Sequence, residues 1–315
     1  MSRNKTRPLL SHYVSGFTFQ ISDFKFQVQV SSLFSLPHNR LSHFDSMGKL
    51  DKQVAWISGA ASGMGEGIAR LFAREGAAVA LADIQADKGK RIAQDIQNEG
   101  GRALFVECDV CHEDAVESSI QHTIREFGGL HIIVNCAGIV QVKLLHEMDV
   151  KDWDRLMDIN VKSIFLSIKH GIAHLRKNPR SYVVNIGSVG SFVGQSSTPA
   201  YTASKGAVLL LSKSIALDYA ADGLRCNCVC PGITDTPMLR EHLKMHSDPE
   251  AALRNRLRRV PIGIPLTPHD IAKAVLYFSC EDSAGVTGTS LVVDGGYLTA
   301  AEWEHPGKTR FMESL

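Results

Sequence analysis

The residue pair with the clearest chemical potential is Tyr201 with Lys205. Apolar residues recur with helical periodicity between Pro199 and Ile215, so the spacing of four predicts that both side chains lie on one helix face. A phenol is a weak acid, and an adjacent ammonium group stabilises its anion. Such a pair could exchange a proton with an alcohol, although the same spacing is common on helix surfaces without any chemical role.

Two further polar side chains stand where they could join this pair. Ser188 ends a predicted strand 13 residues before Tyr201, at the carboxyl edge where open α/β sheets bind ligands. It could hydrogen-bond a substrate oxygen, or it could simply end a turn. Asn160 lies within the predicted helical stretch 151–174, where an amide is a poor helix former. We expect either a local kink that binds water at Asn160 or a side chain that faces solvent.

A glycine-rich turn follows the first predicted strand and opens a helix. Its members include Gly59, Ser62, Gly63, Met64 and Gly65. Glycines allow backbone N–H groups to approach a phosphate, whose charge the N-terminus of the next helix stabilises. The pattern is G-x-x-x-G-x-G rather than the strict G-x-G-x-x-G. It indicates a dinucleotide site, and a turn used only for packing is the alternative.

Asp83 ends the second predicted strand, 18 residues beyond Gly65, near where nucleotide-binding folds hold the adenosine ribose. A carboxylate there accepts hydrogen bonds from the ribose hydroxyls. It repels a 2′-phosphate about 4 Å away by roughly 4 kcal/mol at an effective dielectric constant of about 20, before screening. We therefore expect NAD in preference to NADP, with Ile84 beside the ribose. Asp83 could instead cap the following helix.

Asp109 and Val110 follow the third predicted strand, where the adenine ring would lie. The alternative interpretation of these two residues is an ordinary turn.

From residue 53 onward, short apolar runs alternate with longer helical patterns. The runs are 54–57, 78–81, 103–106, 132–134, 182–184, 226–230 and 291–293. Because they are apolar on both faces, they predict a parallel sheet that helices cover on each side. The expected fold is α/β, a doubly wound (Rossmann) seven-stranded parallel sheet with helices on both faces. We expect one domain over residues 47–300, with 301–315 as an exposed tail.

Residues 1–46 differ in composition from the rest of the chain. They hold six of the 13 phenylalanines, many serines and more basic than acidic side chains. Phe24, Phe26, Val28 and Val30 alternate with polar residues at a strand's period of two, which argues against an amphipathic transit helix. We expect a disordered extension, or a start upstream of the natural one at Met47, without a catalytic role.

The overall charge and the cysteine count exclude several classes of partner and compartment. A formal net charge of +1 provides no global field for nucleic acid or an anionic membrane. No apolar run approaches the roughly 18 residues of a membrane span. Seven cysteines without framework spacing favour a reducing compartment. We expect a cytoplasmic protein, or a mitochondrial one if residues 1–46 are a transit peptide.

The order and spacing of these motifs resemble the short-chain dehydrogenases/reductases in their single-domain form, over residues 50–297. The likeness adds a segment and a loop to the features above. These are Asn135, Cys136, Ala137 and Gly138, and then Pro231 with Gly232. Two departures are Ser58, where the family usually has threonine, and Cys136, where it usually has asparagine.

The resemblance implies a role for each polar residue. Tyr201 would be the acid/base and Ser188 would polarise the carbonyl or alcohol oxygen. Lys205 would assist Tyr201 and hold the nicotinamide ribose. Asn160 would complete a proton relay through water to Lys205.

The resemblance also implies further cofactor contacts and an assembly. The contacts come from Asn135, Ala137, Gly138, Pro231, Gly232, Thr234 near the carboxamide, and Thr236 near the phosphates. The segment 293–297 looks like the family's closing strand, which commonly packs across a dimer axis of a tetramer. We therefore expect a homotetramer or a homodimer.

The leading hypothesis is an NAD-dependent oxidoreductase that interconverts a small-molecule secondary alcohol and a ketone by hydride transfer. One alternative is a 3-oxoacyl-carrier-protein reductase, although Asp83 is awkward for its usual NADP. An alternative of another class is a non-catalytic regulator that senses a dinucleotide. A pure sensor would not need the four polar residues Asn160, Ser188, Tyr201 and Lys205 together.

Three remaining clusters have simpler interpretations. Cys226, Cys228 and Cys230 share one face of a predicted strand and are expected to be buried rather than metal-bound, so we expect no metal site. Arg254, Arg256, Arg258 and Arg259 lie in the segment that the family uses as a substrate lid. A solvated helix face is favoured over recognition of a phosphopantetheine or an acidic carrier. The expected border of a partly apolar pocket consists of Leu144, Leu145, His146, Met238 and Leu239.

Overall fold

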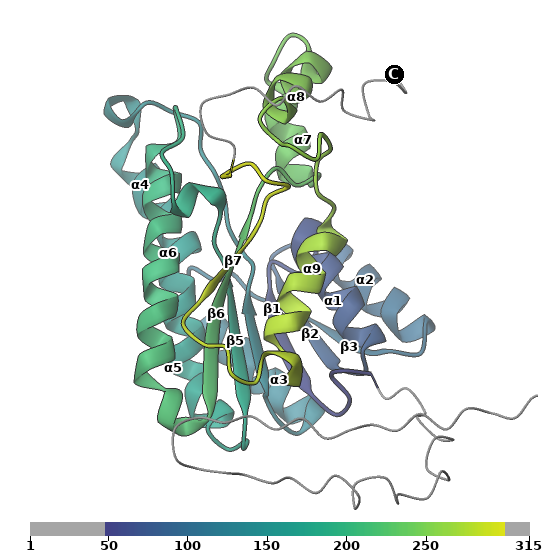
Figure 1. Cartoon of the computed structure of the whole chain (residues 1–315). Coiled ribbons are helices and arrows are strands. Elements are labelled where there is room, and N and C mark those ends of the chain that lie inside the picture. The colour runs from purple at the N-terminus through teal and green to yellow at the C-terminus, as the bar shows by residue number, and fades with distance from the viewer. Residues whose placement is uncertain (1–47, 300–315) are drawn as a thin grey trace, which may run out of the picture. The chain divides into compact units, whose positions relative to one another are not determined.

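Seven parallel strands form one sheet in the order β3-β2-β1-β4-β5-β6-β7 (Figure 1). The computed structural model describes residues 48–299, so the predicted extension 1–46 and tail 301–315 lie outside the described residues. The strands are β1 (Val54–Ser58), β2 (Ala78–Asp83), β3 (Arg102–Glu107), β4 (Ile132–Asn135), β5 (Ser181–Ile186), β6 (Leu224–Pro231) and β7 (Ser290–Val293). Each predicted apolar run is a strand, and the doubly wound fold is confirmed.

Helices cover both faces of this sheet, as Figure 1 shows. One face carries α1 (Gly63–Arg74), α2 (Ala86–Asn98) and α9 (Pro268–Phe278). The other carries α3 (Glu113–Phe127), α5 (Ser163–Leu175) and α6 (Pro199–Asp218). Helix α4 (Val150–Met157) leads into α5 through a π-helical turn, Asp158–Lys162. Short 3-10 turns span Leu145–Glu147, Val189–Ser191, Ala220–Asp222 and Glu281–Ser283.

Two apolar cores hold these layers together. Phe72 of α1 and Phe278 of α9 are fully buried against one face of the sheet. Trp56 of β1 is buried against the other face, where its indole N–H donates to the Ser119 hydroxyl of α3 at 2.7 Å. Because the central strands are buried on both faces, an apolar residue fits at almost every strand position. This is why the strands read as continuous apolar runs in the sequence.

Strands β2 and β3 lie on one side of β1, and the chain then crosses to the other side of β1 to add β4 to β7. The connections therefore change direction between β1 and β4. A crevice opens at such a switch point, outside the carboxyl ends of the strands. Helices α7 (Pro237–Lys244) and α8 (Pro249–Leu257) follow β6 and lie beyond this edge (Figure 1). Within residues 48–299, no helix is both long and apolar enough to span a bilayer.

Candidate active site

A cavity of about 540 Å³ opens at the carboxyl edge of the sheet, beneath α7. It gathers predicted site residues from the first strand-helix turn through to the segment after β6. Those that line it are Met64, Gly138, Ser188, Tyr201, Lys205, Pro231, Gly232, Thr234 and Thr236. The fold therefore brings the acid/base candidates and part of the cofactor set together in one place.

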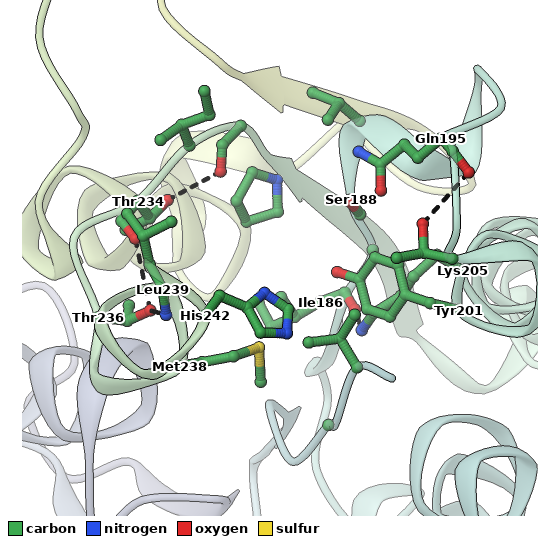
Figure 2. A pocket seen from close by; sticks show the side chains of 18 of the residues that line it. Ile186, Ser188, Gln195, Tyr201, Lys205, Thr234, Thr236, Met238, Leu239 and His242 are labelled. Carbon is green, nitrogen blue, oxygen red and sulfur yellow. Dashed lines mark hydrogen bonds between the residues drawn. The ribbon is translucent and has the colours of Figure 1, made fainter. Parts of the chain in front are cut away.

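Tyr201 lies in the first turn of α6, which Pro199 begins at a position that tolerates proline. Figure 2 shows its ring pointing into the cavity, with His242 and Met238 lying across from it. The Lys205 ammonium lies 5.8 Å from the centroid of the Tyr201 ring. It is buried and donates to the Ile186 carbonyl at the end of β5, at 2.7 Å. A fixed cation therefore stands beside the phenol.

Ser188 follows β5 and caps the 3-10 turn Val189–Ser191, where its hydroxyl oxygen accepts from the Gly190 N–H at 3.0 Å. Accepting this bond leaves the hydroxyl proton free to be donated to a substrate oxygen. The Ser191 hydroxyl accepts from the Ser188 N–H and donates to the Lys205 carbonyl at 2.7 Å. Ser191 thus fixes the serine relative to α6, although it was not predicted as a site residue. Its signal was a serine three positions after Ser188, the spacing of a capping box.

Asn160 lies in the π-helical turn and is only 2% exposed, so the kink predicted there exists and the solvent-facing alternative is wrong. Its amide binds the Ile139 backbone in both directions, accepting from the N–H at 2.8 Å and donating to the carbonyl at 3.0 Å. It also donates to the Ser204 hydroxyl at 2.9 Å. A Cβ added at Gly138 would meet Asn160 Oδ1 at 3.4 Å and Lys205 Nζ at 3.5 Å. Asn160 therefore holds the chain segment that adjoins Lys205.

The glycine turn after β1 has the geometry of an anion cradle. Gly59 and Gly63 have φ of +67° and +55°, which side chains rarely adopt, and a Cβ at Gly59 would lie 2.8 Å from the Ala137 Cα. Ser62, the N-cap of α1, makes no side-chain capping bond, so the first N–H groups of this helix stay available to a ligand. Gly63 also lies next to the Thr236 side chain. These features fit a pyrophosphate between the turn and Thr236.

Asp83 is buried at the end of β2, and its carboxylate accepts from the Ala61 and Gln85 N–H groups, both at 2.9 Å. It does not cap α2, whose N-cap is Gln85. The neighbouring Ile84 is an apolar side chain that is 62% exposed. The carboxylate therefore stabilises the glycine turn through its hydrogen bond with the Ala61 N–H.

The predicted cofactor residues outside the cavity lining follow one line along the sheet edge. Asp109 and Val110 come after β3, Asp83 and Ile84 at the end of β2, and the glycine turn after β1. Asn135 and Ala137 come at the end of β4. Since adjacent strands lie about 4.8 Å apart, this succession forms a continuous path into the cavity. An elongated dinucleotide suits such a path.

A layer of hydrogen bonds behind the cavity joins these strand ends. The Ser58 hydroxyl accepts from the N–H groups of Cys136 at 3.1 Å and Ala137 at 3.2 Å, so it ties β1 to the segment after β4. Asn135 donates to Asn185 at 2.8 Å, which in turn donates to Ser212 at 2.9 Å. Asn185 and Ser212 were not predicted, because their pairing depends on the register of β4 with β5 and on how α6 packs on the sheet.

Cys136 lines the cavity, and burial raises the pKa of its thiol to about 12. It is therefore a neutral side chain near neutral pH.

The border of the cavity corrects two expectations. Its side beyond β6 is formed by residues 237–259, which include α7 and α8 and are called the lid below. Met238 and Leu239 line the cavity as predicted, but Leu144, Leu145 and His146 are not among its described lining residues. Arg256 and Arg259 do line it; Arg256 is half-buried, contrary to the prediction of a solvated face, whereas Arg259 is exposed as predicted. Further lining residues that were not predicted include Val140, Val142, Gln195, His242 and Tyr297.

The cysteines of β6 are core residues. Cys226, Cys228 and Cys230 all have no exposed surface and pack in the core that also contains Trp56. In the described part of the chain, no group of three or more potential ligands is arranged to hold a metal ion.

Comparison with known proteins agrees with this geometry. The model of the family described as "Enoyl-(Acyl carrier protein) reductase" matches residues 59–298. Cis-4-hydroxycyclohexanecarboxylate dehydrogenase of Sinomonas cyclohexanicum is 37% identical over 247 residues, which cover 78% of this chain and 96% of that protein. Cyclopentanol dehydrogenase of Comamonas testosteroni is 36% identical over 251 residues, covering 80% and 99%.

A solved structure gives the same result. Ligand-free aldohexose dehydrogenase of Thermoplasma acidophilum superposes with a TM-score of 0.76 at 33% identity, covering 83% of this chain and all of that one. Each of these relatives is named as a dehydrogenase. The chain belongs to the short-chain dehydrogenase/reductase family.

Proposed function

We propose that this protein is an NAD-dependent dehydrogenase that interconverts a secondary alcohol and a ketone. The observation that carries the proposal is the convergence of Ser188, Tyr201 and Lys205 on one cavity at the end of the cofactor path. The relatives named above support it, because two of them are named for alcohols whose hydroxyl is on a ring carbon.

The residues present suit both the cofactor and the reaction. The glycine turn and Thr236 would hold the pyrophosphate, and the loop from Pro231 to Thr234 would hold the nicotinamide. When bound, the nicotinamide accepts or supplies the hydride. The Ser188 hydroxyl donates a hydrogen bond to the substrate oxygen, and the Tyr201 hydroxyl exchanges the proton with that oxygen. The Lys205 ammonium lies beside the Tyr201 ring, and Asn160 supports the neighbouring segment through which a water relay would pass.

Asp83 supports the preference for NAD over NADP. Its carboxylate is held by two backbone N–H groups at the end of β2. The turn from Ser58 to Gly65 contains no basic side chain that could neutralise a 2′-phosphate. The carboxylate would therefore repel the 2′-phosphate of NADP.

We propose further that the enzyme is a homotetramer or homodimer. Apolar side chains on α5 and α6 support this, since Phe165, Leu210 and Leu217 are 54%, 64% and 80% exposed. Light scattering coupled to gel filtration tests the proposal, and a monomeric mass would contradict it.

We also propose a cytoplasmic location and a non-catalytic role for residues 1–46. The described cysteines are free thiols, which persist in a reducing compartment. Imaging of the chain with a fluorescent C-terminal tag tests the compartment. Mass spectrometry of the native N-terminus tests the extension, and a mature chain that needs residues 1–46 for activity would contradict it.

A substrate panel tests the proposed function. Cyclic and acyclic secondary alcohols, sugars, steroids and 3-hydroxyacyl thioesters are each incubated with NAD and with NADP, and reduced nicotinamide is followed by absorbance. We expect turnover of at least one secondary alcohol with NAD. Turnover of thioesters alone with NADP would favour the carrier-protein reductase. Binding of NAD without turnover of any alcohol would favour the dinucleotide sensor.

A further inference from the structure

The cavity contains two arginines on the side of the lid. Arg256 from the end of α8 and Arg259 just after it line the same cavity as Tyr201. Among the described residues that line this cavity, none is an aspartate or a glutamate. Helix α7 adds the apolar side chains of Met238 and Leu239 and the imidazole of His242 to the lining. The cavity therefore has excess positive charge.

Three other cations of the lid are paired with acidic side chains, unlike these two arginines. Arg240 binds Asp235 at 2.8 Å, and Arg254 lies 3.5 Å from Glu250 and 3.9 Å from Asp248. Lys244 binds Glu241 at 2.6 Å.

Within residues 48–299, Arg256 has no acidic partner within ion-pair distance. Among the described residues, the Arg259 guanidinium contacts the Tyr297 ring, whose centroid lies 5.1 Å away. A guanidinium in a concave site without a carboxylate partner is poised to bind an anion from solution, and its planar fork suits a carboxylate.

Arg256 is placed in the cavity by its proximity to His242 of α7. Burial and the charge of Arg256 together lower the pKa of His242, so Arg256 is close to this half-buried histidine on α7. Figure 2 shows His242 across the cavity from Tyr201. The lowered pKa favours the neutral form of His242, so Arg256 supplies the positive charge beside it.

We propose that the substrate is a hydroxy acid or keto acid whose carboxylate is bound by Arg256 and Arg259 while its hydroxyl or carbonyl carbon faces Tyr201 and Ser188. The inference rests on the proposed dehydrogenase function and narrows its substrate class. It assigns Arg256 and Arg259 as specificity-determining residues. The cofactor pyrophosphate has its own cradle at the glycine turn, so it leaves these arginines to the substrate.

The test compares matched acids and esters. Initial rates with NAD are measured for 3-hydroxybutyrate and 4-hydroxycyclohexanecarboxylate, and for the methyl ester of each. The proteins are the full-length wild type, Arg256→Gln, Arg259→Gln and the double variant. Arg254→Gln is the matched control, because Arg254 is on the same helix but is paired with acids outside the lining.

We expect the wild-type ratio of kcat/KM for acid over ester to exceed about 10, since a hydrogen bond to a charged group is worth about tenfold or more. The double variant should lower this ratio by about 10- to 100-fold, and Arg254→Gln should change it by less than about threefold. A wild-type ratio near one, or a ratio that the double variant leaves unchanged, overturns the inference. A parallel fall for acid and ester with a raised KM for NAD also overturns it, because the arginines would then contact the cofactor.

A binding measurement separates this inference from the proposed function. Calorimetry compares cyclohexanecarboxylate with cyclohexanecarboxamide on the NAD-loaded enzyme, with and without the double substitution. If no alcohol is turned over, the proposed function fails, and this measurement still decides the inference. Tighter binding of the carboxylate that the double variant abolishes supports the inference. Equal binding of the two ligands, or no binding of the carboxylate, overturns it.

Discussion

The carboxylate of Asp83 offers a sharp test of coenzyme selection. In Asp83→Asn the negative charge is lost, although the shape is kept. Its repulsion of a 2′-phosphate about 4 Å away is roughly 4 kcal/mol at an effective dielectric constant of about 20, before screening. If screening leaves about half of this, the ratio of kcat/KM for NAD over NADP should fall by about 10- to 100-fold.

The same substitution has a structural cost that must be measured alongside. Each Asp83 carboxylate oxygen accepts one backbone N–H at 2.9 Å. Asparagine has only one side-chain oxygen, so one of these two N–H groups would lose its acceptor. We expect a loss of about 1–3 kcal/mol of unfolding free energy.

Initial rates with both coenzymes and one alcohol give the ratio, and chemical denaturation gives the stability. The exposed Asp87 on α2 provides the control Asp87→Asn, which removes the same charge four residues further along the chain. An unchanged ratio in Asp83→Asn, or an equal change in Asp87→Asn, would refute the reasoning.

Three further predictions concern the reaction, the cradle and a helix cap. Ser188→Ala should lower kcat by about 100-fold or more, because a donor to the substrate oxygen is lost, and steady-state rates within tenfold of wild type would contradict this. Gly59→Ala should abolish NAD binding in calorimetry and lower the thermal midpoint, since its Cβ would lie 2.8 Å from the Ala137 Cα at a φ of +67°. Normal binding would argue against the cradle. Hydrogen bonds from the Thr267 N–H and hydroxyl hold the pKa of Asp270 below its ordinary value. The stability that the ionised Asp270 contributes is therefore fully present above the pKa of the unfolded chain, about 3.9. It is lost as the pH falls through the lower pKa of the folded protein. The thermal midpoint of wild type should exceed that of Asp270→Asn at neutral pH and converge with it in acid, and a constant gap would count against this assignment.

The fold was predictable because its signals are local. A strand buried on both faces must be apolar throughout, so runs such as 226–230 in β6 stand out from the helical stretches between them. The bounds shift by one or two residues, since β6 extends from Leu224 to Pro231. The kink at Asn160 was one of two expectations for this residue, because asparagine is a poor helix former; the sequence could not distinguish it from a side chain that faces solvent.

The lid was not predictable in the same way. Its helices α7 and α8 are short, and their sequence does not reveal which side faces the cavity. Arg254 pairs with Asp248 and Glu250, whereas Arg256, two positions later, lines the cavity. The segment after β4 was equally hard to predict, because Val140 and Val142 line the cavity and Leu144 does not. Such choices depend on tertiary packing that periodicity does not encode.

The supporting hydrogen bonds behind the site depend on long-range pairing. Asn135 meets Asn185 only because β4 and β5 pair in parallel with these two residues in register. Ser58 meets the Cys136 and Ala137 N–H groups because β1 and β4 are neighbours. The sequence identifies the polar residues but not their partners.

The most direct test of the central claim is Tyr201→Phe, measured both for turnover and for NAD binding. The ring that lines the cavity is kept, while the hydroxyl that exchanges the proton is removed. We expect kcat to fall by about 1,000-fold or more with the best alcohol, and the dissociation constant for NAD to stay within about threefold of wild type. Turnover within about tenfold of wild type would contradict the assignment of Tyr201 as the acid/base.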